Sequence, residues 1–215
     1  MEEKISSFVW KDVEGVKALY LAGSRAVGCE TSRSDWDFFG ITDELYDYER
    51  ESDLNDQLSS RFEADVRFRA ICHAALLGGS PKGVLCKYIP LRVLLRSFPE
   101  WKHLRGESFR LDDFSIEVAS DQDAVRFHKG RLKQYFEKAR TDALPFPFAD
   151  YVKSIFLWIG ARQALRGHEM TMSYVDIAVR ADEQEKLARL CLQYREGSDV
   201  PKSELLEALQ DTLGW

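Results

Sequence analysis

Two aspartates one residue apart, Asp35 and Asp37, are the residues best suited to chemistry in this 215-residue chain. The segment 34–41 (SDWDFFGI) begins with a Ser-Asp turn signal, and the aromatic residues that follow it predict a strand. Side chains along a strand alternate in direction, so the two carboxylates would share one face. Adjacent carboxylates repel each other unless a cation lies between them, and Mg²⁺ prefers such oxygen ligands. The pair therefore predicts a metal site whose ion would also contact substrate phosphates.

A phosphate-binding turn is predicted shortly before this pair. Residues 16–22 (VKALYLA) form an apolar run that predicts a buried strand, and Gly23-Ser24 ends the run. The backbone amides of a turn that leads from a strand into a helix can face anionic phosphate. The turn and the two carboxylates together predict a nucleoside triphosphate site that carries its own metal ligands.

The combination of Gly23-Ser24, a spacer and Asp35-Trp36-Asp37 resembles the signature of the DNA-polymerase-β-like nucleotidyltransferase superfamily. That resemblance implies a third carboxylate on a later strand, beside the first two. The segment 62–68 (FEADVRF) alternates apolar and charged residues, which predicts a half-buried strand with the charged side chains on one face. Asp65 matches the family pattern because apolar residues flank it. Glu63 shares the predicted face and stays an alternative.

A narrower resemblance is to a bacterial and phage branch of predicted nucleotidyltransferases. It rests on the segment 78–81 (GGSP), which is similar to that branch's Gly-Asn-Pro turn with Ser80 in place of Asn. It also rests on Lys153 and Arg162, which lie on a predicted helix as that branch places a Lys and an Arg.

The fold class implied by the resemblance is α+β. We expect a small mixed β-sheet nucleotidyltransferase core with flanking helices, followed by a C-terminal helical bundle. The catalytic domain would span residues 1–115 and the helical domain residues 116–215. Within the first half, residues 50–60 indicate a loop or an exposed helix, and residues 70–77 predict a helix. Further helices are predicted over residues 124–140, 149–165, 182–195 and 203–213.

The resemblance also implies an enzyme that transfers a nucleoside monophosphate from an NTP, such as ATP, to an acceptor hydroxyl and releases pyrophosphate. Three carboxylates would act in catalysis and would hold Mg²⁺, or alternatively Mn²⁺: Asp35, Asp37 and Asp65. A further set of residues would bind the nucleotide: Gly23, Ser24, Arg25, Ser34 and Lys153.

The distribution of charge bears on the acceptor. The chain carries 30 Lys and Arg against 36 Asp and Glu, a net charge of −6, which argues against a general nucleic-acid coat protein. Between Arg126 and Arg166, however, nine basic residues stand against three acidic ones. Local positive charge of this kind favours an RNA 3′ end as the acceptor, whereas a solvated helix face would give the same pattern. A protein or a small molecule remains an alternative acceptor.

A second function belongs to a different class. The same motif could serve a regulatory or antitoxin-like nucleotide-binding protein that acts through a partner protein. Retention of Ser24, Asp35, Asp37 and Asp65 argues against it, because a binding module need not keep every metal ligand.

Several features of the sequence indicate where in the cell the protein is located. The sequence contains no apolar run near the length of a membrane-spanning helix. The charged start MEEK, without a following apolar stretch, argues against a secretory signal. The four cysteines show no paired spacing, so we expect neither a disulfide framework nor a zinc site. These features predict a cytoplasmic protein, and the oligomeric state is left open.

Overall fold

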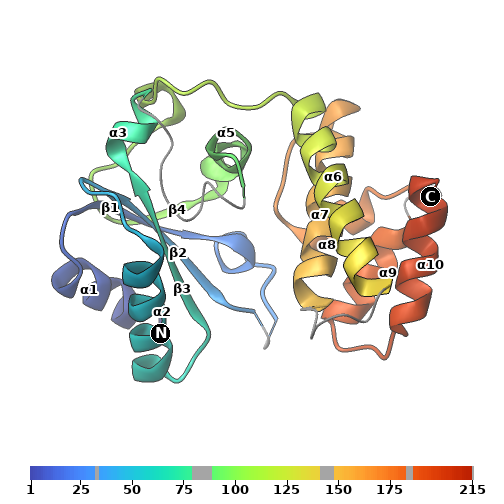
Figure 1. Ribbon diagram of the computed structural model, residues 1–215, viewed down its shortest axis with the longest axis horizontal. Helices are drawn as coiled ribbons and strands as arrows, with labels where there is room; N and C mark the ends of the chain where they lie inside the picture. The colour runs from blue at the N-terminus through green and yellow to red at the C-terminus, as the bar shows by residue number, and fades with distance from the viewer. Residues whose placement is uncertain (32–33, 79–88, 141–147, 183–185, 215) are drawn as a thin grey trace. The chain divides into compact units, whose positions relative to one another are not determined.

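The computed structural model describes residues 1–31, 34–78, 89–140, 148–182 and 186–214 (Figure 1). The chain divides into two compact units, Met1–Ala119 and Ser120–Trp215. The first unit contains a mixed sheet with helices, and the second is helical, so the predicted fold class is confirmed. The assignment of a catalytic domain to residues 1–115 and a helical domain to residues 116–215 stays a prediction.

Within the described residues, the sheet of the first unit has four strands in the order β3-β2-β1-β4. β1 (Val16–Ala22) pairs antiparallel with both β2 (Trp36–Thr42) and β4 (Lys102–Gly106). β2 pairs parallel with β3 (Val66–Cys72). A parallel pair needs a crossover connection, and α2 (Tyr48–Phe62) provides it.

One face of the sheet packs against α1 (Glu2–Asp12) and α2. Ile5, Val9 and Leu58 from these helices are fully buried in one cluster with Leu21 and Phe38 from the strands. Apolar side chains at alternate strand positions therefore form the core on this side.

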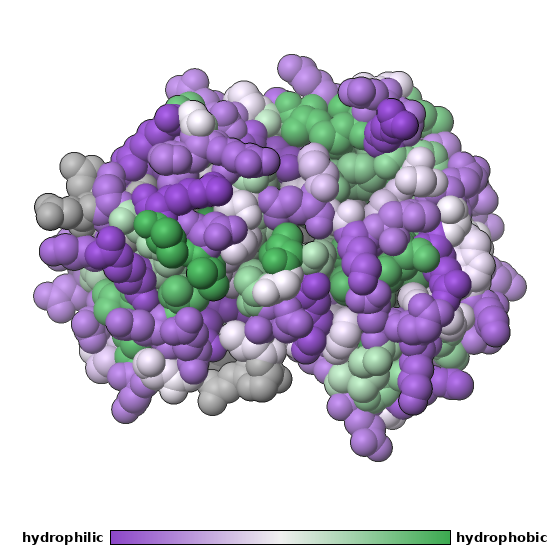
Figure 2. All heavy atoms as spheres, turned by 180° about the vertical axis from the view of Figure 1, so that it is seen from behind, coloured by the Kyte–Doolittle hydropathy of each residue, from purple (hydrophilic) through white to green (hydrophobic). Residues whose placement is uncertain are grey.

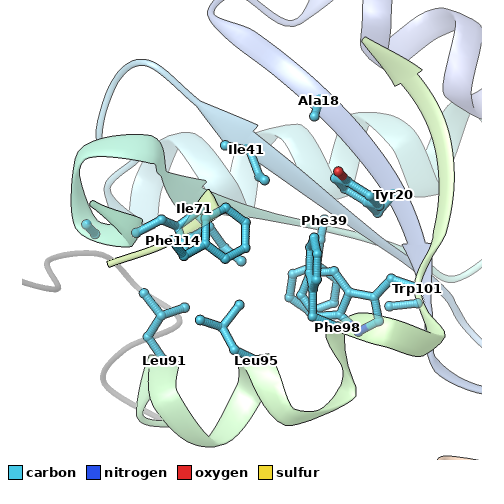
Figure 3. Packing of buried hydrophobic residues seen from close by; sticks show 13 residues of the cluster. Ala18, Tyr20, Phe39, Ile41, Ile71, Leu91, Leu95, Phe98, Trp101 and Phe114 are labelled. Carbon is cyan, nitrogen blue, oxygen red and sulfur yellow. The ribbon is translucent and has the colours of Figure 1, made fainter. Parts of the chain in front are cut away.

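The opposite face carries an aromatic cluster (Figure 3). Phe39 stacks on Trp101 with 4.3 Å between ring centroids, and Phe98 and Tyr20 pack beside them. Asp37 precedes Phe39 by two residues on β2 and therefore points to this same face. Short helical segments of this unit include α3 (His73–Leu76), α5 (Leu91–Leu94), and the 3₁₀ turns η2 (Leu95–Glu100) and η3 (Leu111–Asp113).

The outer edge of β3 is covered by polar side chains of α2. Three backbone amides at alternate positions of the strand donate to helix side chains spaced by four residues, a match between the two periodicities. The three hydrogen bonds run from Val66 N to Ser59 Oγ (3.1 Å), from Phe68 N to Asn55 Oδ1 (2.6 Å) and from Ala70 N to Glu51 Oε1 (3.0 Å). The helix thereby satisfies an edge that would otherwise attract another strand.

Two sequence predictions about this region are wrong. The strand predicted over residues 62–68 begins only at Val66, because α2 continues through Phe62 and ends at Glu63 in a left-handed cap with φ 49°. The helix predicted over residues 70–77 is also shorter, since β3 continues to Cys72 and α3 follows only at His73. The polar stretch 50–60 lies within α2 and is a helix, one of the two forms expected.

The second unit is built around an apolar helix. α7 (Phe148–Leu165) buries Tyr151, Ile155, Phe156 and Ile159 completely. Helices packed around it in the unit include α6 (Asp121–Arg140), α8 (Tyr174–Val179) and α9 (Lys186–Arg195), and α10 (Lys202–Leu213) packs on α9. Helices were predicted near all of these except α8. A segment as short as α8 carries little periodicity by which to find it.

The surface of the protein is mixed. In the view of Figure 2, hydrophilic side chains cover most of the face and hydrophobic ones gather in separate patches. In the described part of the chain, no helix combines the length and apolar character needed to cross a membrane.

Candidate active site

The Gly-Ser turn and the second aspartate lie against each other. β1 ends at Ala22, which pairs with Asp37 across the antiparallel ladder, and the 3₁₀ turn η1 (Gly23–Arg25) follows directly. Gly23 has φ 69°, and a Cβ placed there would lie 2.7 Å from Asp37 Oδ2. Glycine is therefore required twice, for its backbone conformation and for the close approach of the carboxylate. The spacing between the two motifs brings them together as expected.

The turn is closed by its own backbone. Ala26 N donates to Gly23 O at 3.1 Å, and Cys29 N donates to Ser24 O at 2.9 Å. Ser24 is buried within it, with 6% of its surface exposed. Phosphate binding by Gly23 and Ser24 stays a prediction.

Asp35 and Asp37 are joined at the site by Arg67. Asp35 immediately precedes β2, and Asp37 lies opposite Arg67 in the parallel register of β2 and β3. Arg67 Nη1 is 3.3 Å from Asp35 Oδ2. Burial by itself would lower the pKa of Arg67, but the attraction of Asp35, of Asp65 and of Asp37 outweighs it and raises the pKa. The guanidinium thus stays charged among three carboxylates.

Asp65 reaches the site mainly through its backbone. Its carbonyl accepts from Trp36 N at 2.8 Å, which ties the residue to the start of β2. Its carboxylate is 61% exposed and lies 3.3 Å from Arg67 Nη2. Among the described residues, no group of three or more Asp, Glu, His or Cys side chains is arranged to hold a metal ion. The role of Asp65 as a third ligand stays a prediction, and the alternative, Glu63, is exposed at the cap of α2.

Arg25 and Ser34, both predicted nucleotide contacts, lie at the backbone that enters β2. Arg25 Nε donates to Asp35 O at 3.1 Å, and its Nη2 donates to Ser34 O at 2.8 Å. The guanidinium carbon lies 4.1 Å from the centroid of the Trp36 ring. Ser34 Oγ accepts from Thr31 N at 2.9 Å. These contacts are all within the chain, and nucleotide binding by the two residues stays a prediction.

The remaining predicted residues lie elsewhere in the chain. Lys153 is half-buried on α7, in the second unit, and its contact with nucleotide stays a prediction. Arg162, from the same helix, lies over the Trp158 ring at 4.8 Å. Most of the Gly-Gly-Ser-Pro segment, residues 79–81, falls outside the described residues.

The donor set suits a divalent cation. Asp35 and Asp37 supply carboxylate oxygens at the start of the central strand β2, and a neighbouring phosphate would complete a hard, oxygen-only environment of the kind that Mg²⁺ takes. Because Arg67 pairs with Asp35, a cation bound by these aspartates would compete with that ion pair. Arg67 was missed as a site residue, although the alternation that drew attention to Asp65 also contains it.

Comparisons with known proteins give one family match for the first part of the chain and one similar fold for the whole chain. Residues 3–77 match the family model described as polymerase beta, nucleotidyltransferase. The fold is similar to the crystal structure of spectinomycin adenyltransferase AAD(9) from Enterococcus faecialis with ATP and spectinomycin. That match has a TM-score of 0.66 and 13% identity and covers 100% of this chain and 98% of that one. The match of residues 3–77 confirms the resemblance of this part of the chain to polymerase-β-like nucleotidyltransferases.

A further structural match is a toxin–antitoxin structure with AMP-PNP, at a TM-score of 0.39 and 20% identity over 65% of this chain and 94% of that one. No curated protein sequence matches the chain.

Proposed function

We propose that the protein is a metal-dependent nucleotidyltransferase that moves a nucleoside monophosphate from an NTP to an acceptor hydroxyl. The observation that carries the proposal is the contact between the Asp37 carboxylate and Gly23, which joins the Gly-Ser turn to the Asp-x-Asp pair. A site that transfers a nucleoside monophosphate from an NTP needs phosphate binding and metal ligation side by side. The match of residues 3–77 to a nucleotidyltransferase family supports the same chemistry.

Different residues of the chain would carry out different parts of the reaction. Asp35 and Asp37 would hold Mg²⁺, or Mn²⁺, which when bound would neutralise phosphate charge and polarise the α-phosphorus. The turn at Gly23 and Ser24 would place the β- and γ-phosphates. Asp65, exposed beside Arg67, would accept the proton of the attacking hydroxyl. The oxygen of the acceptor would bond to the α-phosphorus as its bond to the bridging oxygen breaks, and pyrophosphate would leave.

An RNA 3′ end is the favoured acceptor, and a protein or a small molecule is the alternative. The support is the exposed basic side of α6, where Arg126, Lys129 and Lys133 follow one another at helical spacing. Arg126 is partly neutralised by Asp123, at 3.4 Å. Lysines on such a stripe can bind a phosphate backbone. The proposal also includes nucleotide binding by Lys153 and a cytoplasmic location.

The test is transfer of label by the full chain. The protein is incubated with each α-labelled NTP and Mg²⁺ and, in separate reactions, with total RNA, protein or a small-molecule extract. We expect one pool to become labelled, and Asp37→Asn to abolish the labelling. Asp56→Asn, an exposed change on α2, is the matched control and should behave as wild type. Tight NTP binding without any labelled product would instead support a nucleotide-binding regulator.

A further inference from the structure

We propose that Arg25 is a positioning residue that holds the two aspartates beside the phosphate turn, in place of the nucleotide ligand expected from sequence. The inference rests on the proposed function, since it assigns the arginine a part in building that metal site. Its starting point is the pair of hydrogen bonds from one guanidinium to consecutive carbonyls, those of Ser34 and Asp35.

The ladder between β1 and β2 explains why such a contact is needed. The register of the two strands runs as far as the pair Ala22 and Asp37, after which β1 departs into η1. Asp35 therefore lies beyond the last pair of that ladder. On the β3 side the chain is held by the bond from Trp36 N to Asp65 O. On the β1 side the Arg25 side chain donates to the carbonyls where strand amides would otherwise do so.

The chemistry of arginine suits this position. A guanidinium presents several N–H donors in a rigid planar fork, and hydrogen bonds from a charged donor are stronger than neutral ones. The plane of the group also lies over Trp36, the residue between the two aspartates, at 4.1 Å. One side chain thus contacts the backbone of the first aspartate and the residue that separates the pair.

The consequence concerns metal binding. Arg25 is the last residue of η1, and the same turn carries Gly23, against which Asp37 packs. Fixing Asp35 to this turn sets the spacing of both carboxylates before a cation arrives, and ligands held in place bind metal more tightly. Loss of Arg25 should therefore weaken metal binding, whereas loss of a nucleotide ligand should weaken NTP binding in the absence of metal.

The experiment measures two affinities by calorimetry on the full chain: Mn²⁺ alone, and ATP in the presence of EDTA. The variants are Arg25→Ala and Arg25→Lys, with Asp37→Asn as the metal-site reference. Arg61→Ala is the matched control, because Arg61 also lies over an aromatic ring, that of Phe8 at 4.4 Å, outside the motif. Thermal unfolding of each variant reports whether it is folded.

We expect Arg25→Ala to weaken Mn²⁺ binding by about tenfold or more, as for other residues that orient metal ligands. Arg25→Lys should weaken it by less, since lysine can reach a carbonyl but lacks the fork and the plane. ATP affinity in EDTA should stay within about twofold in both variants, and Arg61→Ala should bind Mn²⁺ as wild type does.

Three results would overturn the inference. One is a loss of ATP affinity in EDTA with Mn²⁺ affinity intact, which would make Arg25 a nucleotide ligand. Another is an Mn²⁺ affinity in Arg25→Ala equal to that of Arg61→Ala. If Arg25→Ala does not fold, wild-type Mn²⁺ affinity in Arg25→Lys would be decisive against the inference. An unchanged Mn²⁺ isotherm in Asp37→Asn is a separate result, because it would remove the proposed metal site itself.

Discussion

Gly23 and Gly28 share a backbone φ of 69° but differ in their surroundings. A Cβ at Gly23 would lie 2.7 Å from the Asp37 carboxylate, whereas a Cβ at Gly28 would meet nothing within 4 Å. Substitutions at these two glycines therefore separate the cost of the backbone conformation from the cost of displacing the Asp37 side chain. This close approach of Gly23 and Asp37 links the turn to the second aspartate.

The first prediction concerns this pair of glycines. Gly23→Ala should lower the rate of nucleotidyl transfer at least about a hundredfold, because the alanine methyl group would push the Asp37 carboxylate out of place. Gly28→Ala should keep most of the rate. Each change should cost about 1–2 kcal/mol of unfolding free energy, since φ is positive at both positions. Initial rates and urea denaturation measure the two effects, and equal rates in the two variants would contradict the prediction.

Residue types and spacing were enough to predict a strand that ends in a turn at Gly23-Ser24, because these signals are local in the sequence, whereas metal binding by Asp35 and Asp37 stays a prediction. They were not enough for Arg25 and Arg67. The contacts of these arginines depend on where β1 leaves the ladder and on the register of β2 with β3, and neither is visible in a local pattern.

Among the helices and strands, the hydrogen bonds from the edge of β3 to side chains of α2 bear on two predictions, one for residues 50–60 and one for residues 62–68. The polar stretch 50–60 lacks an apolar stripe because its Glu51 and Asn55 side chains face strand amides. The strand over residues 62–68 was predicted too early because charges alternate through the helix cap as well as through the strand. Over so few residues, charged side chains can alternate with apolar ones at a helix cap as well as at the start of a strand.

The second prediction concerns Glu51, which is buried with 2% of its surface exposed. Burial raises the pKa of this carboxyl above 4.5, although the amide of Ala70 and the charge of Arg69 act in the opposite direction. The folded protein therefore keeps this proton at a pH where the unfolded chain has lost it. The stability contributed by Glu51 is fully present below the unfolded pKa and is lost as pH rises through the folded pKa.

Glu51→Gln should remove this dependence, because glutamine can still accept from Ala70 N but carries no charge. The stability of the variant relative to wild type should therefore increase as the pH is raised from about 4 to 7. Urea denaturation across that range measures the difference, and Glu49→Gln on the exposed side of α2 is the control. A difference that does not change with pH would contradict the assignment.

At the scale of the whole molecule, charge is distributed unevenly. The chain has a net charge of −6, yet α6 exposes a basic stripe that includes Lys129 and Lys133. If this stripe contacts single-stranded RNA, each lysine should contribute to affinity by releasing counterions. A solvated helix face would make no such contribution, so salt dependence distinguishes the two interpretations.

The third prediction follows from that difference. The double change Lys129→Glu and Lys133→Glu should weaken RNA binding by about tenfold at low salt and should reduce the slope of log affinity against log salt by about 1.4. NTP binding should be unchanged. Lys186→Glu, an exposed change of the same type on α9, is the control. Equal RNA affinity in the double variant and the control would favour a protein or a small molecule as acceptor.

We propose above that the site formed by the Gly23 turn and Asp37 transfers the nucleotidyl group. The most direct measurement compares ATP labelled at the α-phosphate with ATP labelled at the γ-phosphate, using the acceptor pool found with the wild-type protein. We predict that α-label enters the acceptor, that γ-label is recovered in pyrophosphate, and that Asp37→Asn abolishes both while Asp56→Asn does not. Transfer of γ-label to the acceptor, or undiminished transfer of α-label by Asp37→Asn, would contradict it.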